Sequence, residues 1–195
     1  MTGAMARSGN RDEIACLDEA ALVERVADGD RAAFDALYRC YYPRLTRFLE
    51  RVTRRPNLVE EVLNDTMLVV WRRGHTYNGQ SKVSTWIFAI AYRKALKALK
   101  RWEDVPSEES DVDESHAPSE PEGEVQRLQL RALFQRALAT LSPSQRAVVE
   151  LTYYEGHAYR DIAEIMDCPV GTVKTRMFHA HRKLKLALAE RAEDM

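Results

Sequence analysis

Apolar residues recur at intervals of three and four along most of the chain, and the alternation of apolar and polar residues that is typical of strands is missing. This pattern predicts an all-α protein. The expected helices cover residues 18–28, 31–53, 57–73 and 84–101, and then 124–140, 143–155, 159–166 and 170–188.

Several helix ends carry local signals. Pro56 marks the start of the third helix, and Ser142 followed by Pro143 combines a capping side chain with a first-turn proline. Gly156 is expected to end the helix that begins at Pro143. Ser84 is expected to cap the fourth helix.

The segment EDVPSEESDVDESHAPSEPEGE separates the two sets of helices. It contains three prolines, many Ser and Glu residues and almost nothing to bury, so we expect it to be extended or disordered. Because so long a segment is unusual inside one compact domain, it indicates a domain boundary. The expected organisation is a leader over 1–18, a first lobe over 19–102, an acidic linker over 103–124 and a second lobe over 125–195.

Charge is segregated along the chain, although the formal net charge is only −1. Residues 1–102 carry 18 Lys and Arg against 12 Asp and Glu, a balance of +6. The linker carries 10 acids and no Lys or Arg, a balance of −10, and residues 125–195 carry 11 basic against 8 acidic residues, a balance of +3. Two basic lobes joined by an acidic segment indicate nucleic-acid binding by both lobes.

Neither the apolar runs nor the cysteines indicate export. The longest apolar runs, over 67–71 and 86–92, are far too short to cross a bilayer, and the amino-terminal segment lacks the apolar core of a secretory signal. Cys16, Cys40 and Cys168 are odd in number and lack CxxC spacing, so we expect reduced thiols rather than a disulfide framework or a zinc site. These features favour a cytoplasmic protein without membrane insertion.

Residues 159–184 predict two short helices joined by a tight corner. Pro169 prevents one continuous helix, and Asp167 adopts a left-handed conformation more readily than most residues. The apolar faces that should pack together, and onto the helix over 143–155, consist of Ile162, Ala163, Met166, Val173, Met177, Ala180 and Leu184. This pattern indicates a helix-turn-helix, whose second helix reads the major groove. The alternative is a packed pair of helices with a solvated face.

The opposite face of the second helix carries groups that can donate hydrogen bonds to phosphates and base edges. The candidate DNA contacts there are Thr172, Lys174, Thr175, Arg176, His179 and Lys183.

A cationic stripe closes the first lobe. Its members are Arg93, Lys94, Lys97, Lys100 and Arg101, at positions i, i+1, i+4, i+7 and i+8 of a helix, and no acid lies among them. Such a stripe suits a DNA backbone. The alternative is an ordinary solvated helix face.

The loop over 74–82, with Gly74 and Gly79, precedes this stripe and offers both stacking and hydrogen-bonding groups. We expect the 77–86 segment to hold an unpaired base of an opened duplex, because stacking contributes roughly 1–3 kcal/mol per base and offsets the loss of base pairing. The candidate residues are Tyr77, Asn78, Gln80, Ser81, Lys82, Thr85 and Trp86. Trp86 has an equal alternative role as a core anchor for the fourth helix.

The segment over 141–184 resembles the C-terminal domain of bacterial sigma factors of the extracytoplasmic-function (ECF) type. The matching residues are Leu141, Arg146, Leu151, Asp161, Ile162, Ala163, Gly171, Thr172, Val173, Lys174, Thr175 and Arg176. The segment over 77–101 resembles the promoter-melting segment of the same family through Tyr77, Gly79, Ser81, Thr85, Trp86, Ile90, Ala91 and Ala95. The segment over 59–72 resembles the helix that docks on the polymerase clamp. The order of the segments is more specific than any one of them.

The resemblance implies a sigma factor that binds core RNA polymerase, recognises a −10 and a −35 promoter element and helps to open the DNA. It implies contacts with the β′ clamp helices through Glu61, Asn64, Asp65 and Leu68, and a further contact with the β flap. It also implies an anti-sigma factor as a partner. The sequence itself shows no Ser-His-Asp set, no Walker-type glycine loop and no metal-binding cluster, so we expect no catalytic centre, cofactor or metal. A stand-alone helix-turn-helix regulator with a helical sensing domain is the alternative function.

Some positions depart from the family pattern. Arg93 stands where the family often has Asn, and Lys97 where it often has Asp, which affects the expected preference near the start site. His179 and His181 replace frequent arginines. Histidine donates fewer hydrogen bonds and titrates near neutrality, so we expect a weaker and pH-dependent phosphate contact there. In the family the linker threads the RNA path of the polymerase; a passive tether is the alternative for this chain.

Overall fold

The computed structural model of this chain describes residues 18–104 and 137–192. Every regular element in these two ranges is a helix, which confirms the all-α prediction for this part of the chain. The leader, almost all of the linker and most of the helix expected over 124–140 lie outside the described residues.

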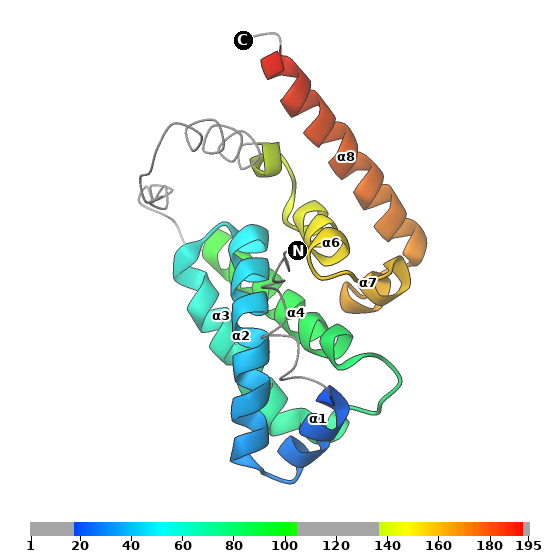
Figure 1. Cartoon of the computed structure of the whole chain (residues 1–195). Helices are drawn as coiled ribbons and strands as arrows, with labels where there is room; N and C mark the ends of the chain where they lie inside the picture. The colour runs from blue at the N-terminus through cyan, green and yellow to red at the C-terminus, as the bar shows by residue number, and fades with distance from the viewer. Residues whose placement is uncertain (1–17, 105–136, 193–195) are drawn as a thin grey trace, which may run out of the picture.

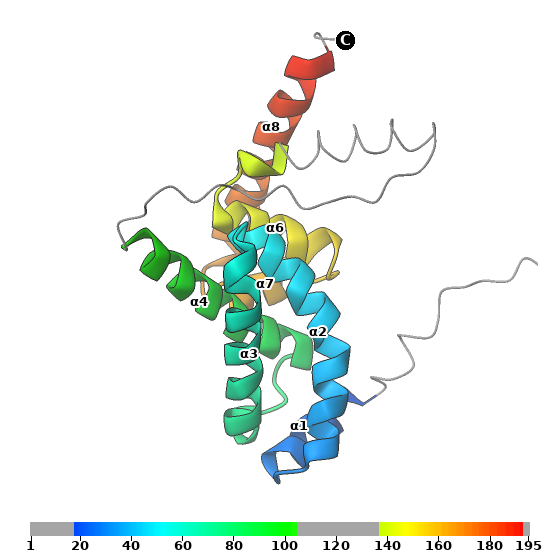
Figure 2. The ribbon, with the colours of Figure 1, turned by 90° about the vertical axis from the view of Figure 1, so that its left-hand side faces the viewer.

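The first lobe is built on two long helices that run side by side, with a third packed against both (Figures 1 and 2). Its elements are α1 (Glu19–Ala27), α2 (Arg31–Thr53), α3 (Pro56–Arg73), the 3₁₀ turn η2 (Gly74–Thr76) and α4 (Val83–Glu103). Asp30 caps α2, because its carboxylate accepts from the backbone N–H groups of Ala32 and Ala33 at 2.8 and 3.2 Å. Pro56 occupies the first turn of α3, as its position in the sequence predicts.

The start of α4 differs from the sequence prediction. The helix begins at Val83, and its N-cap is Lys82, whose backbone is extended and whose side chain makes no capping bond. Ser84 lies inside the first turn, so the prediction that it caps this helix is wrong. The N-cap is the last residue before the helix whose backbone is still extended, and in this loop that residue is Lys82.

The second lobe contains α6 (Pro143–Tyr153), α7 (Tyr159–Ile165) and α8 (Val170–Ala192). Ser142 and Gln145 form a reciprocal capping box at the start of α6, which confirms the expected helix start. Gly156 follows α6 with a φ of +68°, a conformation that suits glycine. The far end of α8 projects away from the other helices (Figures 1 and 2).

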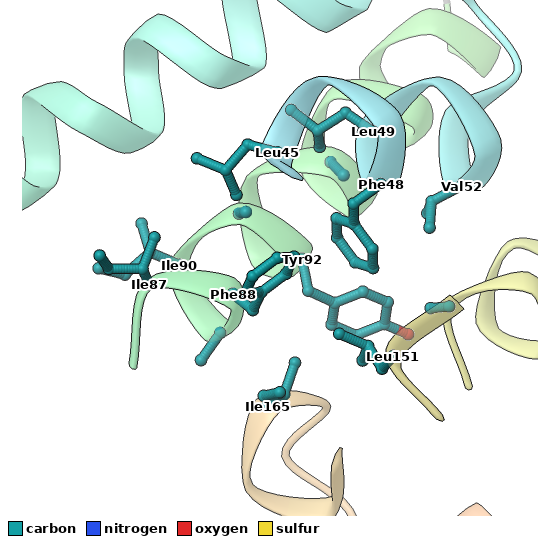
Figure 3. Packing of buried hydrophobic residues seen from close by; sticks show 14 of the residues in the cluster. Leu45, Phe48, Leu49, Val52, Ile87, Phe88, Ile90, Tyr92, Leu151 and Ile165 are labelled. Carbon is teal, nitrogen blue, oxygen red and sulfur yellow. The ribbon is translucent and has the colours of Figure 1, made fainter. Parts of the chain in front are cut away.

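One hydrophobic core runs through both lobes. α2 packs against α6, and α4 packs against α7. Figure 3 shows the side chains that meet there: Leu45, Phe48, Leu49 and Val52 of α2, Ile87, Phe88, Ile90 and Tyr92 of α4, Leu151 of α6 and Ile165 of α7. Burying each large apolar side chain contributes about 1.5–3 kcal/mol, so this shared core holds the lobes together in the closed arrangement.

The cysteines only partly follow the sequence prediction. Cys168 is a free thiol, as expected. Cys40 is disulfide-bonded, so the expectation of a reduced thiol is wrong at that position. An odd cysteine count and the absence of CxxC spacing do not prevent one pair, because a disulfide depends on the distance between the two residues in the fold. Cys16 lies outside the described residues.

No helix within residues 18–104 and 137–192 is long and apolar enough to cross a membrane.

Candidate nucleic-acid interface

The corner between α7 and α8 has the geometry of a helix-turn-helix. Asp167 has a φ of +48°, which confirms the left-handed conformation expected for it. The N–H of Cys168 donates to the Ala163 carbonyl at 3.0 Å, and the N–H of Thr172 donates to the Pro169 carbonyl at 2.8 Å. These bonds close the turn from both sides and fix the direction in which α8 leaves it.

The apolar residues predicted to pack inside this motif do so. Six of them are buried and Leu184 is half-buried against the core, so the opposite face of α8 is left to solvent; the buried six are Ile162, Ala163, Met166, Val173, Met177 and Ala180.

Four of the six candidate DNA contacts on α8 are exposed: Lys174, Thr175, His179 and Lys183. Two of these have intramolecular partners, since the Thr175 hydroxyl donates to the Gly171 carbonyl at 3.0 Å and Lys183 donates to the Thr140 carbonyl at 3.2 Å. Thr172 is half-buried. Arg176 is also half-buried, and its guanidinium lies 3.5 Å from the Cys168 sulfur.

Two aromatic neighbours on this surface were not expected from the sequence. Phe178 is 64% exposed on α8, with its ring centroid 5.6 Å from that of His179. An exposed aromatic residue among the polar positions of a recognition helix is the signal that could have identified it. Tyr153 of α6 lies 2.9 Å from Nε2 of His181, so that histidine already has a hydrogen-bonding partner.

The loop before α4 is held by its own side chains. The Tyr77 hydroxyl donates to the Ser81 carbonyl at 2.7 Å, and the N–H of Gln80 donates to the Asn78 side chain at 3.1 Å. The rings of Tyr77 and Trp86 lie 5.6 Å apart at a tilt of 48°. Both rings are half-buried and pack against the core, so Trp86 anchors α4 while it contacts Tyr77.

Two other residues of the same segment, Lys82 and Thr85, lie in different surroundings. Lys82 forms an ion pair with Asp161 of α7 at 3.2 Å. Thr85 is buried, and its hydroxyl finds no hydrogen-bond partner among the described residues. In this arrangement Thr85 is not available to DNA, whereas the Lys82 side chain remains 68% exposed beside its acidic partner.

The cationic stripe is not free of acids, which corrects the sequence expectation. Lys94 pairs with Asp65 of α3 at 2.9 Å, and Arg101 pairs with Glu61 of α3. Helical periodicity shows which residues share a face of one helix, but it does not show which acids a neighbouring helix places beside them. The three stripe residues that are exposed and have no ion pair within the described ranges are Arg93, Lys97 and Lys100.

The residues expected to contact polymerase lie along one side of α3. Glu61, Asn64 and Leu68 are exposed and Asp65 is half-buried. The Tyr38 hydroxyl of α2 donates to the Asn64 side chain at 3.3 Å. Leu68, at 43% exposed, is the apolar member of this surface.

A helix-turn-helix, a second cationic helix and an aromatic loop together define a helical DNA-binding protein. Comparison with known families makes the class specific: residues 37–103 match Sigma-70 region 2, and residues 131–184 match Sigma-70, region 4. The ECF RNA polymerase sigma-E factor of Haemophilus influenzae is 31% identical over 185 residues, which cover 87% of this chain and 94% of that protein. The chain belongs to the ECF family of RNA polymerase sigma factors.

Two further relatives agree with this assignment. The RNA polymerase sigma-H factor of Pseudomonas aeruginosa is 30% identical over 177 residues, which cover 86% of this chain and 92% of that protein. The ECF RNA polymerase sigma-E factor of Escherichia coli K12 is 31% identical over 179 residues, which cover 86% and 93%.

Solved structures show the same fold. CnrH in complex with the cytosolic domain of CnrY matches with a TM-score of 0.65 and 21% identity, over 88% of this chain and 97% of that chain. The sigma factor RpoE of Bartonella quintana, in complex with the anti-sigma factor NepR, matches with a TM-score of 0.62 and 23% identity, over 80% and 96%.

Proposed function

We propose that this chain, as an ECF sigma factor, binds core RNA polymerase, directs it to promoters through two separated DNA elements and helps to open the duplex. The presence of both sigma regions in one chain, in the order of the family, carries this conclusion. The chain is a transcription initiation factor and not an enzyme in its own right, because its work consists of binding.

We assign recognition of the −35 element to α8. Its exposed Lys174, Thr175 and His179 supply hydrogen-bond donors at the amino-terminal half of the helix, where a recognition helix meets base edges. Phe178 adds an apolar group of the kind that contacts the thymine methyl.

We assign the −10 element and strand opening to α4 and the loop before it. Arg93, Lys97 and Lys100 present three positive charges on one exposed face of α4, none of them in an ion pair within the part of the chain that the structure describes. The loop holds Asn78 and Gln80 in a local hydrogen bond, and the Tyr77 and Trp86 rings lie 5.6 Å apart; these features support a role in which a flipped base meets polar groups and an aromatic surface.

We assign polymerase binding to α3, through Glu61, Asn64, Asp65 and Leu68. An exposed leucine among acids suits a basic helical partner such as the β′ clamp helices, and the second lobe would then reach the β flap. The place of action would be the cytoplasm, where the polymerase works. An anti-sigma factor is a further expected partner, because the similar RpoE of Bartonella quintana was crystallised with one.

The alternative, a stand-alone helix-turn-helix regulator, makes a different prediction for core polymerase. A pull-down with core polymerase, followed by run-off transcription on a matched promoter, separates the two functions. A sigma factor is retained by the core enzyme and supports initiation from an otherwise silent template. A chain that binds duplex DNA but is neither retained by core polymerase nor able to support initiation would contradict the proposal.

A further inference from the structure

A row of aromatic side chains follows the seam between α2 and α3, two helices that lie side by side (Figures 1 and 2). Phe34, Tyr38 and Tyr42 stand four residues apart in α2, so they share one side of that helix. The ring centroids of Phe34 and Tyr38 are 6.2 Å apart, and those of Tyr38 and Tyr42 are 5.6 Å apart. Trp71 of α3 closes the row, since its ring meets that of Phe34 edge-on at 5.2 Å. We call these four residues the aromatic row.

Neighbours on both sides hold the Tyr38 ring in place. Aromatic rings attract one another in tilted or edge-on arrangements at centroid separations of about 4.5–7 Å. Tyr38 has such a neighbour in Phe34 and another in Tyr42. Phe34, Tyr38 and Trp71 are half-buried against the core, whereas Tyr42 at the end of the row is 46% exposed. The packing therefore restricts the Tyr38 ring and keeps its hydroxyl in one position.

This hydroxyl reaches across the seam to Asn64 of α3. It donates a hydrogen bond to the side-chain oxygen of Asn64 at 3.3 Å. Burial raises the pKa of Tyr38, and Tyr42 and Glu60 nearby act in the same direction. The hydroxyl consequently keeps its proton at neutral pH and remains a hydrogen-bond donor.

The bond from Tyr38 decides which end of the Asn64 amide faces outward. An amide side chain has an acceptor oxygen at one end and an NH₂ group with two donors at the other. Because the oxygen is turned toward Tyr38, the NH₂ group is the outward end of this exposed side chain. The terminal torsion of asparagine is broad and roughly two-fold, so without the bond the amide can turn over and exchange its two ends.

Asn64 lies in the middle of the α3 surface that we assign to core polymerase. Glu61 stands three residues before it and Leu68 four residues after it, on the same side of the helix, and both are exposed. A partner helix that packs on Leu68 would therefore lie beside the Asn64 amide. The matching group on that helix is a hydrogen-bond acceptor, such as a side-chain carbonyl or carboxylate oxygen.

We propose that Tyr38 is a positioning residue for polymerase binding: the aromatic row holds its hydroxyl, and the hydroxyl fixes the Asn64 amide with its NH₂ group toward the partner. This proposal rests on the proposed function, because it takes the α3 surface as the binding site for core polymerase. A side chain that is already ordered loses less conformational entropy on binding. Tyr38 thereby raises the affinity through Asn64.

The test removes the Tyr38 hydroxyl and keeps its ring. Tyr38→Phe should weaken the binding of labelled core polymerase by roughly threefold to tenfold, the loss expected for one hydrogen bond. The matched control is Tyr42→Phe, because Tyr42 is the next ring of the row and its hydroxyl has no hydrogen-bond partner among residues 18–104 and 137–192. Tyr42→Phe should leave the affinity unchanged. Both variants should keep the helical circular dichroism of the wild type.

A double-mutant cycle separates positioning from a structural role. Asn64→Ala removes the group that Tyr38 holds, so Tyr38→Phe should cause no further loss of affinity in that background. Leu68→Ala removes a neighbouring contact and leaves Asn64 in place, so Tyr38→Phe should keep its full effect there. A general weakening of the seam between α2 and α3 would instead lower the affinity in both backgrounds.

The free chain gives a second readout that does not depend on polymerase. The side-chain NH₂ signals of Asn64 in an NMR spectrum should shift on Tyr38→Phe, because the amide loses the bond to its oxygen. They should stay in place on Tyr42→Phe. Signals that respond equally to the two substitutions would show that the Tyr38 hydroxyl does not hold the amide, and the inference would fall.

The binding data can also overturn the inference. Equal affinities of folded Tyr38→Phe and Tyr42→Phe would do so, as would equal losses from Tyr38→Phe in the Asn64→Ala and Leu68→Ala backgrounds. An Asn64→Ala chain that binds core polymerase as tightly as the wild type would remove the group through which Tyr38 acts. Failure of the proposed function has a different signature, because core polymerase would then not retain even the wild-type chain.

Discussion

The Arg51 guanidinium donates to both carboxylate oxygens of Glu150, at 2.8 and 3.1 Å, although the two residues are 99 positions apart in the sequence. The aromatic ring of Tyr154 lies 4.0 Å from the same guanidinium. A charge pair at this depth contributes orientation more than net stability, because desolvation offsets much of the attraction. It therefore specifies how the lobes close without making the closed state permanent.

Three exposed cations of α4 have no ion pair among residues 18–104 and 137–192 and should contribute most of its electrostatic contact with DNA. Replacing Arg93, Lys97 and Lys100 together by alanine removes up to three phosphate contacts, so the slope of log affinity against log salt should fall by about 2 to 3. The measurement is binding of the polymerase complex to promoter DNA over a range of salt concentrations. The matched control is Lys94→Ala with Arg101→Ala, whose cations are already paired with acids of α3. Equal loss of slope in the two variants would contradict this division of the stripe.

The division of the cationic stripe into paired and exposed residues could not be predicted from the sequence, because it depends on contacts between helices. Features set within one helix or turn were predictable: the Ser142 cap and the left-handed Asp167 follow from residues a few positions away. The pairing of Lys94 with Asp65 depends on how α3 lies beside α4, which periodicity does not encode.

The contact between the two lobes was unpredictable for the same reason. Arg51 and Glu150 meet through packing of helices from opposite ends of the chain, and the acidic segment between them favours separate lobes when it is considered alone. The candidate −35 residues were predictable as a helix face. Phe178 was not predicted, because it belongs neither to the apolar face of that helix nor to its hydrogen-bonding groups, and the structure exposes it.

Leu68 should anchor the contact with core polymerase. Leu68→Ala removes an exposed apolar side chain from the α3 surface and should weaken binding of the core enzyme by roughly 1–2 kcal/mol, the range of a moderate interface residue. Leu186→Ala is the control, because it truncates a similarly exposed leucine on the projecting part of α8. Titration of labelled core polymerase measures both, and indistinguishable affinities would remove Leu68 from the interface.

Phe178 should contribute to sequence discrimination by α8. The relevant quantity is the preference for a −35 site that contains the thymine over a site in which that base pair is replaced. Phe178→Ala should reduce this preference by about 1–3 kcal/mol, because the apolar contact with the methyl group is lost. Non-specific binding should change little, since no charge is removed. Competition between the two duplexes gives the ratio directly. A uniform loss of affinity for both duplexes would instead indicate a structural role.

The packing of the two lobes against each other should depend on pH through Glu150 and His157, whose effects have opposite signs. Burial raises the pKa of Glu150 from 4.5 to about 7, and the charges of Arg51, Glu155 and Arg47 act on it as well. Its contribution to the closed state is therefore fully present below pH 4.5 and is lost as pH rises through about 7.

His157 acts in the other direction. Burial lowers its pKa from 6.5 to about 4, and Asp161 opposes this while Arg44 and Lys82 add to it. Its contribution is present above pH 6.5 and is lost as pH falls through about 4, so the two groups partly cancel in the wild-type chain.

Variants that remove one group should expose the other. With Glu150→Gln, closing should be favoured as pH rises, by about fourfold between about pH 6 and about pH 8. With His157→Gln, closing should be favoured as pH falls, by about tenfold over the same range. Energy transfer between fluorophores at exposed Arg72 of α3 and Glu164 of α7 measures both profiles. Slopes of the same sign in the two variants would show that these residues do not titrate with the closure.

The most direct test of the whole account compares one distance in two states of the wild-type protein. Energy transfer between Arg72 and Glu164 label sites is measured in the free chain and again in its complex with core polymerase and promoter DNA. The account predicts high transfer in the free chain and its loss in the complex, because the lobes must then hold elements about 70 Å apart. Transfer that stays high in a complex active in run-off transcription would contradict it.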